Sequence, residues 1–279
     1  MKEIIFTKMT GNGNDYVVID NRKDSILEKD KSNIAKLLCP RRWSIGADGM
    51  LLIERSKTGD FVMRIFNPDG GEAEMCGNGA RCAVKFAYLK FCKKQNITMQ
   101  TKAGLIKARV KKETVSLAMT EPLQIRLSLN LKLKEMTKEI SFINTGVPHV
   151  VFFTDNLEKA DVFRLGKEIR YYPEFSPQGT NVNFVQIISG NDIKVRTYER
   201  GVEEETWACG TGSVASAIIA YLKKNVPGPV NVMTKGGGLM VHFKEKDGKI
   251  VDVFLEGKAS VVYEGRIKIP LFPPLKKGD

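Results

Sequence analysis

The feature that most constrains this chain is an internal repeat that gives each half one cysteine motif. Cys76-Gly77-Asn78-Gly79 recurs as Cys209-Gly210-Thr211-Gly212, a shift of 133 residues (76 to 209). The same shift carries Thr101-Lys102 onto Thr234-Lys235. Matches that keep one register over such a distance predict two copies of one domain, because solenoid repeats have far shorter periods.

Both halves follow the same predicted order of elements, with one helix among short strands. In the first half, we expect strands over 61–66, 97–100, 105–110 and 114–119, with a helix whose apolar stripe runs over 83–91. In the second half, we expect strands near 195–198, 230–233, 239–243 and 250–255, with a nearly all-apolar, buried helix over 213–222. This order predicts an α+β fold of two pseudo-symmetric domains. We expect modules at 1–121 and 122–264, with the tail 265–279 returning to the first.

Length and composition limit the classes of protein to which this chain can belong. The 279 residues are 42% hydrophobic, enough for two buried cores, and no apolar run approaches the roughly 20 residues that span a bilayer. The N-terminus lacks the features of a signal peptide, and the five cysteines are an odd number, so we expect reduced thiols in the cytoplasm. The net charge of +12 is spread along the chain, which favours attraction of an anionic substrate over nucleic-acid or membrane binding.

The repeated cysteine motif predicts an acid/base site. Each cysteine stands just before a helix, where free N–H groups and the helix dipole favour a carboxylate and can lower the pKa of a thiol. The Gly-x-Gly that follows lets the backbone approach a ligand closely. Two such thiols facing one cleft could invert an amino acid, one removing the α-proton and the other returning a proton to the opposite face.

Other roles of cysteine fit this sequence less well. Cys39, Cys82 and Cys92 are better interpreted as small buried apolar residues. The spacing of the cysteines does not match a zinc site, and the two histidines lie far from them in sequence, so we expect no metal and no cofactor. A disulfide between Cys76 and Cys209 would be an oxidised, inactive form.

The wider motifs resemble the diaminopimelate epimerase family over essentially the whole chain. The resemblance rests on Asn67 to Cys82, on Tyr198 to Gly212, on Lys8 to Asp15 and on Asn181 to Val185. It implies a cofactor-independent isomerase that converts LL-2,6-diaminopimelate to the meso form, for lysine and peptidoglycan synthesis. It also implies two similar α+β domains, each a β-structure wrapped round a central helix, with the substrate buried between them.

The resemblance assigns site residues one by one. Cys76 and Cys209 would transfer protons, and Gly77, Asn78, Gly210 and Thr211 would hold the reacting carboxylate. The remaining substrate-binding residues would be Asn14, Asn67, Asn181, Glu199 and Arg200. Arg200 suits a carboxylate and Glu199 an ammonium group. Structural alternatives stay open: a turn at Asn67, a left-handed loop residue at Asn14, a backbone contact at Asn181 and a surface ion pair between Glu199 and Arg200.

Two positions depart from one common version of the family pattern. Gly49 stands where some family members carry glutamine, and Val147 where many carry asparagine, so strict specificity is in doubt. His149 matches a family histidine that either orients the site or is structural. A proline-type or broader amino-acid racemase is the rival enzyme, and a non-catalytic binding protein on the same fold is the rival from another class. The sequence leaves a homodimer open.

Overall fold

The computed structural model of the chain describes residues 2–269, which form two compact units. Unit 1 contains residues 2–115 and 259–269, and unit 2 contains residues 116–258. Both divisions come a few residues before those predicted. The chain leaves unit 1 within β8 (Thr114–Ala118) and returns to it with β18 (Ser260–Ile269), so the returning segment begins before Gly265. The part of the predicted tail from residue 270 onward lies outside the described residues.

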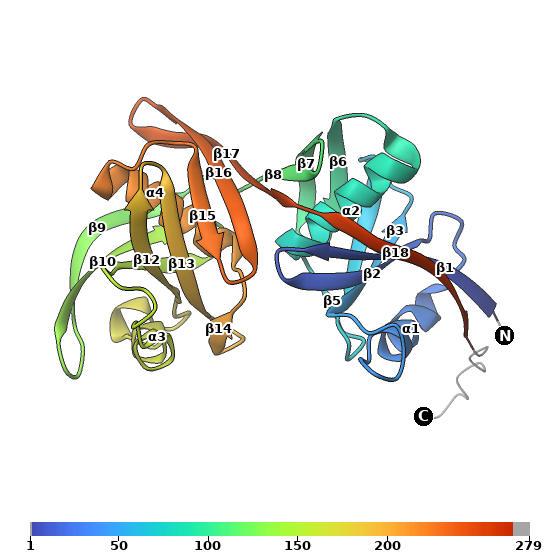
Figure 1. The fold of residues 1–279 in the computed structure, drawn as a ribbon, viewed down its shortest axis with the longest axis horizontal. Coiled ribbons are helices and arrows are strands. Elements are labelled where there is room, and N and C mark those ends of the chain that lie inside the picture. Colours follow the sequence, from blue (N-terminus) through green and yellow to red (C-terminus); the bar gives the residue numbers. More distant parts are fainter. Residues whose placement is uncertain (1, 270–279) are drawn as a thin grey trace. The chain divides into compact units, whose positions relative to one another are not determined.

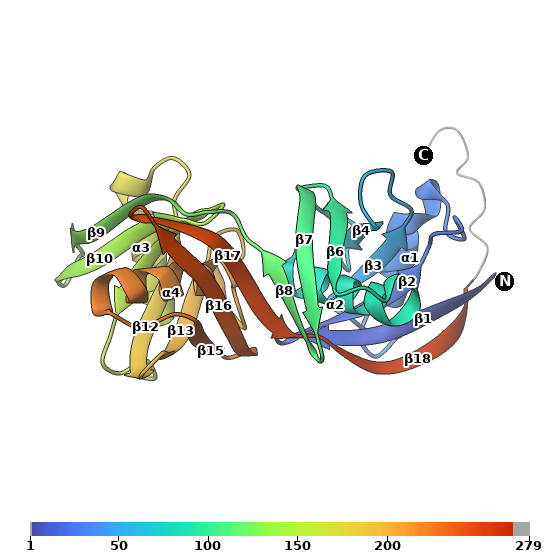
Figure 2. The ribbon, with the colours of Figure 1, turned by 90° about the horizontal axis from the view of Figure 1, so that it is seen from above.

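Unit 1 is a mixed sheet built around one helix (Figures 1 and 2). Its other strands are β1 (Lys2–Gly11), β2 (Asn14–Asp20), β3 (Gly49–Glu54), β4 (Phe61–Phe66), β5 (Glu72–Ala73), β6 (Asn96–Thr101) and β7 (Gly104–Lys111). Its helices are η1 (Glu28–Asp30), α1 (Lys31–Leu38), α2 (Gly77–Ala87) and the π-helical turn η2 (Tyr88–Cys92). The pairs β2–β3 and β4–β6 are parallel, and β1–β18, β1–β2, β3–β4, β4–β5 and β6–β7 are antiparallel. Helix α2 packs against β1, β2, β3, β4 and β7.

Unit 2 repeats this pairing strand for strand. Its strands are β9 (Leu123–Lys132), β10 (Thr137–Asn144), β11 (Pro148–Phe153), β12 (Asn181–Ser189), β13 (Asp192–Glu199), β14 (Glu204–Thr206), β15 (Val230–Thr234), β16 (Gly237–Lys246) and β17 (Lys249–Lys258). Its helices are α3 (Val162–Arg170), η3 (Pro173–Phe175) and α4 (Gly210–Lys224). The pairs β11–β12 and β13–β15 are parallel, as β2–β3 and β4–β6 are in unit 1. Helix α4 packs against β10, β11, β12, β13, β15, β16 and β17.

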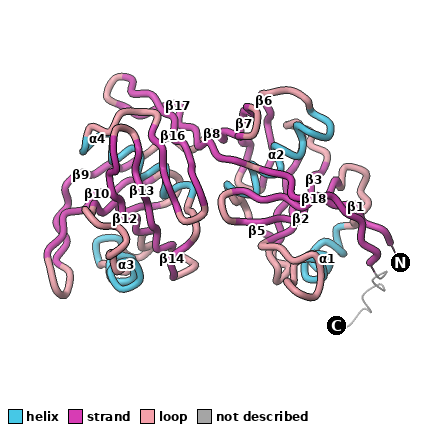
Figure 3. The backbone as a smooth tube through the Cα atoms, viewed as in Figure 1, coloured by secondary structure: helices cyan, strands magenta, loops and turns pink. Residues whose placement is uncertain are grey.

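The two central helices differ in the kinds of side chain that they bury. Every residue of α4 from Gly212 to Ala220 is buried, which confirms the predicted all-round burial of this apolar helix. Helix α2 buries Ala83, Val84 and Ala87 of its predicted stripe, but it also buries Arg81 completely. Strands hold more residues than helices in both units, as Figure 3 shows, and the predicted α+β fold of two repeated domains is confirmed.

The approach of α3 to β13 gives a test of the packing in unit 2. A Cβ atom on Gly166 would lie 2.5 Å from Cβ of Tyr198, whose ring is almost fully buried. Alanine raises helix propensity by about 1 kcal/mol over glycine, but overpacking a core costs about 1–3 kcal/mol. We therefore expect Gly166→Ala to lower the free energy of unfolding, as measured by denaturant titration.

Gly238→Ala in β16 is the matched control, because a Cβ atom there would meet open space. We expect it to change the free energy of unfolding by no more than about 0.5 kcal/mol. A Gly166→Ala protein as stable as the parent would show that helix α3 is free to move away from Tyr198.

Candidate active site

Each unit holds its motif cysteine at the N-cap of its central helix. Cys76 precedes α2 with φ −143° and ψ 123°, and Cys209 precedes α4 with φ −108° and ψ 114°. Their carbonyl oxygens accept the first helical hydrogen bonds, from Ala80 N at 2.8 Å and Ser213 N at 2.9 Å. Neither thiol caps its own helix. The first N–H groups of both helices are therefore directed at the space beside each sulfur, where an anion would be stabilised.

A duplicated ion-pair cluster supports both cysteines from the strand side. In each unit, one glutamate lies on the short strand that leads to the cysteine (β5 or β14). This glutamate pairs with an arginine of the preceding strand (β4 or β13) and with a lysine that directly follows the next strand (β6 or β15). The members are Arg64, Glu72 and Lys102 in unit 1 (N–O 2.7 and 2.8 Å) and Arg196, Glu205 and Lys235 in unit 2 (2.7 and 2.9 Å). The repeat in the sequence contains these residues, but no local pattern marks them as an ion-pair cluster.

The unit 1 half-site brings together Asn14, Asn78 and Cys76. Asn78 Nδ2 donates to Asn14 Oδ1 at 2.7 Å, and Asn14 Nδ2 donates to Asp48 Oδ2 at 3.0 Å. Asn14 is the first residue of β2, and the left-handed loop residue is Asn12 instead, with φ 47°. The side-chain amides of Asn14 and Asn78 therefore have a defined orientation.

Two further residues, Tyr16 and Arg81, make contacts in this half-site and were not predicted from the sequence. The Tyr16 hydroxyl lies 3.1 Å from Cys76 Sγ, and Arg81 Nη2 donates to Asn12 Oδ1 at 2.9 Å and to Asn78 Oδ1. Asn67, by contrast, is exposed and begins a turn, since its carbonyl accepts from Gly70 N at 2.9 Å. Arg81 lies inside the motif from Asn67 to Cys82, and Tyr16 directly follows the motif from Lys8 to Asp15, but neither residue type by itself indicates a contact with this half-site.

The unit 2 half-site surrounds a more deeply buried thiol. Cys209 is only 7% exposed, and burial raises the pKa of its thiol to about 12, with Glu199 acting in the same direction. The Thr211 hydroxyl, at 3.5 Å from Sγ, and the nearby Thr211 and Gly212 N–H groups oppose this shift of the pKa. The predicted lowering of the thiol pKa by the helix start is therefore wrong for Cys209, because desolvation is the larger effect.

The three predicted polar residues of unit 2 lie next to one another in the structure. Asn181 Oδ1 accepts from the backbone N of Arg200 at 2.8 Å, while its Nδ2 donates to Pro148 O at 3.0 Å. Glu199 accepts from the Thr206 hydroxyl at 2.9 Å, and burial raises the pKa of its carboxyl. Asn181 thus holds the backbone of Arg200 in position.

His149 is fully buried on β11, beside Asn181 in the register with β12. Its Nδ1 is 3.1 Å from Asn183 Nδ2, and its Nε2 has no hydrogen-bond partner among the described residues. Burial, together with the charge of Arg200, lowers the pKa of His149 to about 3, so its ring is neutral near pH 7. Because Nδ1 accepts from the Asn183 amide, the proton of the neutral ring lies on Nε2.

The two departures from the family pattern also have defined places. Gly49 is the unit 1 counterpart of Asn181, since Gly49 pairs with Tyr16 as Asn181 pairs with His149. A Cβ atom on Gly49 would lie 3.0 Å from Phe66 O, so a larger residue there requires a shift of β3 or β4. Val147 is half-buried, just before β11.

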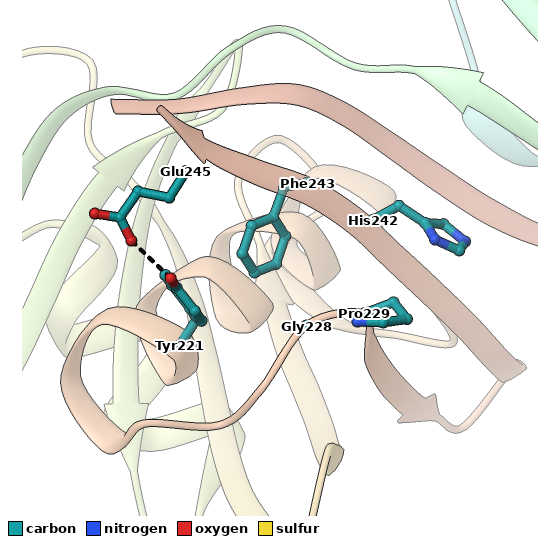
Figure 4. Close-up of a pocket in the computed structure, with 6 residues that line it drawn as sticks. All are labelled: Tyr221, Gly228, Pro229, His242, Phe243 and Glu245. Carbon is teal, nitrogen blue, oxygen red and sulfur yellow. Dashed lines mark hydrogen bonds between the residues drawn. The ribbon is translucent and has the colours of Figure 1, made fainter. Parts of the chain in front are cut away.

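A surface hollow of about 280 Å³ in unit 2 contains none of the predicted residues (Figure 4). It is lined by Tyr221, Gly228, Pro229, His242, Phe243 and Glu245, with the Tyr221 hydroxyl donating to Glu245 at 2.6 Å. It lies near the C-terminal end of α4, whereas Cys209 stands at the N-terminal end. We therefore do not assign it to the reaction.

In residues 2–269, no group of three or more histidine, cysteine, aspartate or glutamate side chains is arranged to hold a metal ion. Within the same residues, no helix combines the length and the hydropathy needed to cross a membrane.

Comparisons with known proteins agree with the duplicated architecture. A family model described as diaminopimelate epimerase matches residues 6–125 and 141–262. The chain is 44% identical to the diaminopimelate epimerase of Aquifex aeolicus, over 94% of this chain and 97% of that one. It is 42% identical to the diaminopimelate epimerase of Methanocella arvoryzae, over 96% and 98% of the two chains.

Solved structures of low identity share the fold. A phenazine biosynthesis protein of the PhzF family from Bacillus anthracis superimposes with a TM-score of 0.73 at 18% identity, over 96% of this chain and 100% of that one. A probable proline racemase from Agrobacterium radiobacter gives 0.64 at 16% identity, over 97% and 94%.

Two repeated α+β units, each with a cysteine at the start of its central helix, define an isomerase of the epimerase and racemase class. The length of the family match and the identity to the curated relatives narrow this class further. The chain belongs to the diaminopimelate epimerase family.

The buried His149 predicts a pH dependence of stability. Its pKa is lower in the folded protein than the unfolded value of about 6.5, so the unfolded chain binds more protons between these values and stability falls as pH decreases. For one such group, the slope approaches about 1.4 kcal/mol per pH unit below pH 6.5. We expect His149→Gln to remove most of this slope between pH 6.5 and 5, measured by denaturant unfolding.

His242→Gln, which removes the other histidine of the chain, is the matched control and should keep the slope of the parent. Equal slopes in the parent and in His149→Gln would mean that His149 takes up a proton without unfolding.

Proposed function

We propose that this chain converts LL-2,6-diaminopimelate to the meso form without a cofactor, with Cys76 and Cys209 as the two proton-transfer groups. The observation that carries the proposal is that both homologous units have a cysteine as the N-cap of the central helix. Membership of the diaminopimelate epimerase family supports the choice of substrate. Proline racemase and PhzF-type structures share only the fold at 16–18% identity, so they do not favour a different substrate.

The proposed reaction moves protons only. One thiolate takes the α-proton: an S–H bond forms, the Cα–H bond breaks, and its electron pair spreads toward the α-carboxylate. The thiol of the other half-site then gives its proton to the opposite face of the same carbon, which inverts the centre. An α-amino acid is a weak carbon acid, so the charge that develops is the main obstacle, and N–H groups at two helix starts would stabilise it. Gly77, Asn78, Gly210 and Thr211 supply these groups.

The substrate has a second, charged end, and the polar residues suit it. We propose that the Arg200 guanidinium binds a carboxylate and that Glu199 binds an ammonium group. The raised pKa of the half-buried Glu199 supports this, because a carboxyl that lacks a cation in the substrate-free protein would gain one with the substrate. Asn14 and Asn67 would contact the substrate from unit 1, and Asn181 would act by holding the Arg200 backbone.

We further propose that the enzyme works in the cytoplasm and supplies meso-diaminopimelate for lysine and peptidoglycan synthesis. All five cysteines are unpaired, which suits a reducing compartment, and the mechanism requires free thiols at Cys76 and Cys209. Diaminopimelate would be the small-molecule partner, and a homodimer stays a prediction.

The roles of the cysteines can be tested with LL-diaminopimelate in D2O, following stereochemistry and deuterium at the α-carbon together. General acid/base groups contribute about 100-fold to 10,000-fold, so we expect Cys76→Ala and Cys209→Ala each to lower kcat/KM by at least about 100-fold. Cys92→Ala, which removes a half-buried thiol outside the site, should retain the parent rate. Turnover of proline but not of diaminopimelate by the parent protein would overturn the proposed substrate.

The role of Arg200 predicts a change in substrate binding. A charge-assisted hydrogen bond contributes about 1.5–3 kcal/mol, so Arg200→Met should raise KM for diaminopimelate by about 10-fold to 100-fold. Steady-state kinetics measures this, with Arg126→Met as the control that removes a surface arginine paired with Glu174 in the same unit. An unchanged KM in Arg200→Met would exclude the guanidinium from the binding site.

A further inference from the structure

Arg81 is a buried cation for which the described residues offer no ordinary counter-ion. Its side chain is fully buried, and its Nε and Nη1 atoms have no hydrogen-bond partner among residues 2–269. None of the ion pairs in the described part of the chain includes it. Burying a charge without a partner is strongly unfavourable, so the environment of Arg81 requires a nearby anion.

The start of helix α2 is where that anion would be stabilised. Arg81 Nη1 is 3.9 Å from where a Cβ atom on Gly77 would lie, so the guanidinium sits beneath the first turn of the helix. The positive end of the helix dipole is at the same place, and it adds to the field of the guanidinium. Both the helix dipole and the guanidinium of Arg81 therefore favour a negative charge at this point.

Three weakly acidic groups face Arg81, and they differ in burial. They are Cys76, Cys82 and Tyr16. Burial raises the pKa of the Cys82 thiol to about 12 and also raises the pKa of the Tyr16 phenol, so both stay neutral near pH 7. Asp48, which also faces Tyr16, is already paired with Arg41 at 2.8 Å. This leaves the half-buried Cys76 as the group that can carry the charge.

The Tyr16 hydroxyl completes this environment. It lies 3.1 Å from Cys76 Sγ, and either atom could be the donor. When the sulfur is a thiolate it has no proton to donate, so the phenol must be the donor. A hydrogen bond to a charged acceptor is stronger than one between neutral groups, and it would hold the sulfur in one orientation.

Unit 2 lacks both features at the equivalent positions. The shift that relates Cys76 to Cys209 relates Arg81 to Val214 and Tyr16 to His149. Val214 carries no charge, and the lowered pKa of His149 keeps its ring neutral. The carboxyl group facing Cys209 is Glu199, which disfavours a second negative charge.

We propose that Tyr16 and Arg81 are positioning residues that keep Cys76 as the thiolate of the substrate-free enzyme, while Cys209 holds the proton. The inference deepens the proposed function, because it decides which of the two proton-transfer groups is the base before substrate binds. It also explains why a cation is buried beneath one helix start and not beneath the other.

The charge state can be measured without substrate, from the ultraviolet absorbance of thiolates at pH 7. We expect one thiolate per chain in the parent and in Cys209→Ser, and none in Cys76→Ser. A signal that persists in Cys76→Ser, or no signal in the parent, would overturn the inference. Because no substrate is present, this result is independent of whether diaminopimelate is the substrate.

The two positioning residues are tested by the rate at which iodoacetamide alkylates each cysteine, followed by mass spectrometry of the separate peptides. Loss of one hydrogen bond to a charged group should slow alkylation of Cys76 by about tenfold in Tyr16→Phe, with no change at Cys209. Tyr221→Phe, which removes a phenol oxygen from the surface hollow, should leave both rates unchanged.

Arg81 is tested with a pair of variants, because its burial makes it part of the core. Arg81→Met should lower the rate at Cys76 more than Tyr16→Phe does, and Arg81→Lys, which keeps the charge, should recover part of the loss. If Arg81→Met fails to fold, the alkylation rates of Cys76 in Arg81→Lys and Tyr16→Phe still test whether the two residues act on Cys76. Alkylation of Cys76 that is unaffected by Tyr16→Phe would overturn the role of the phenol.

Discussion

Both half-sites depend on how closely the first turn of each central helix approaches the strands beneath it. A Cβ atom on Gly79 would lie 3.3 Å from a Leu51 methyl, and one on Gly212 would lie 2.3 Å from Asn183 Oδ1. Only glycine permits this approach at Gly212 without displacing buried side chains. The approach brings the helix N–H groups and the N-cap cysteine into one place, and the duplicated Arg–Glu–Lys cluster secures the strand that leads to each cysteine.

The strand side chains beneath the two central helices differ chemically, although the backbone is similar. Beneath α2 the strands present Tyr16, Leu51 and Ile65 to Gly79. The equivalent positions beneath α4 are His149, Asn183 and Thr197, and there Thr197 donates to Asn183 Oδ1 at 3.0 Å while Asn183 Nδ2 contacts His149. Unit 1 therefore has mostly apolar side chains and one phenol beneath its helix, whereas unit 2 has a buried polar network at the same place. Duplication preserved the backbone geometry, and the side chains beneath each helix diverged.

The sequence predicted the repeated part of the fold well, because the repeat itself supplied independent evidence for each element. The strand at 61–66 is β4 to the residue, and the predicted helix over 213–222 lies inside α4. The sequence analysis did not predict α1 or α3. Helix α3 alternates charged and apolar residues over only nine positions, and its burial against Tyr198 depends on Gly166, which reads as a helix breaker when seen alone. Burial against a distant strand cannot be read from local pattern.

For the site, motif spacing predicted the cysteines and the helix starts, but it could not predict burial. The deep burial of Cys209 raises the thiol pKa by more than the helix start lowers it, and this burial depends on packing from several strands. Arg81 was missed for the same reason: an arginine in a helix is usually exposed, and only the fold shows that this one is fully enclosed.

The path of the chain through the two units has a consequence for synthesis. Unit 2 is one uninterrupted segment, whereas unit 1 needs β18 to pair with β1 along nearly its whole length. On the ribosome, the second unit is therefore complete before the first. Until residues 260–269 emerge, β1 has a bare edge of unpaired N–H and C=O groups, the kind of edge that attracts other chains. Strand β18, the last strand among the described residues, thus completes the unit that the first strand began.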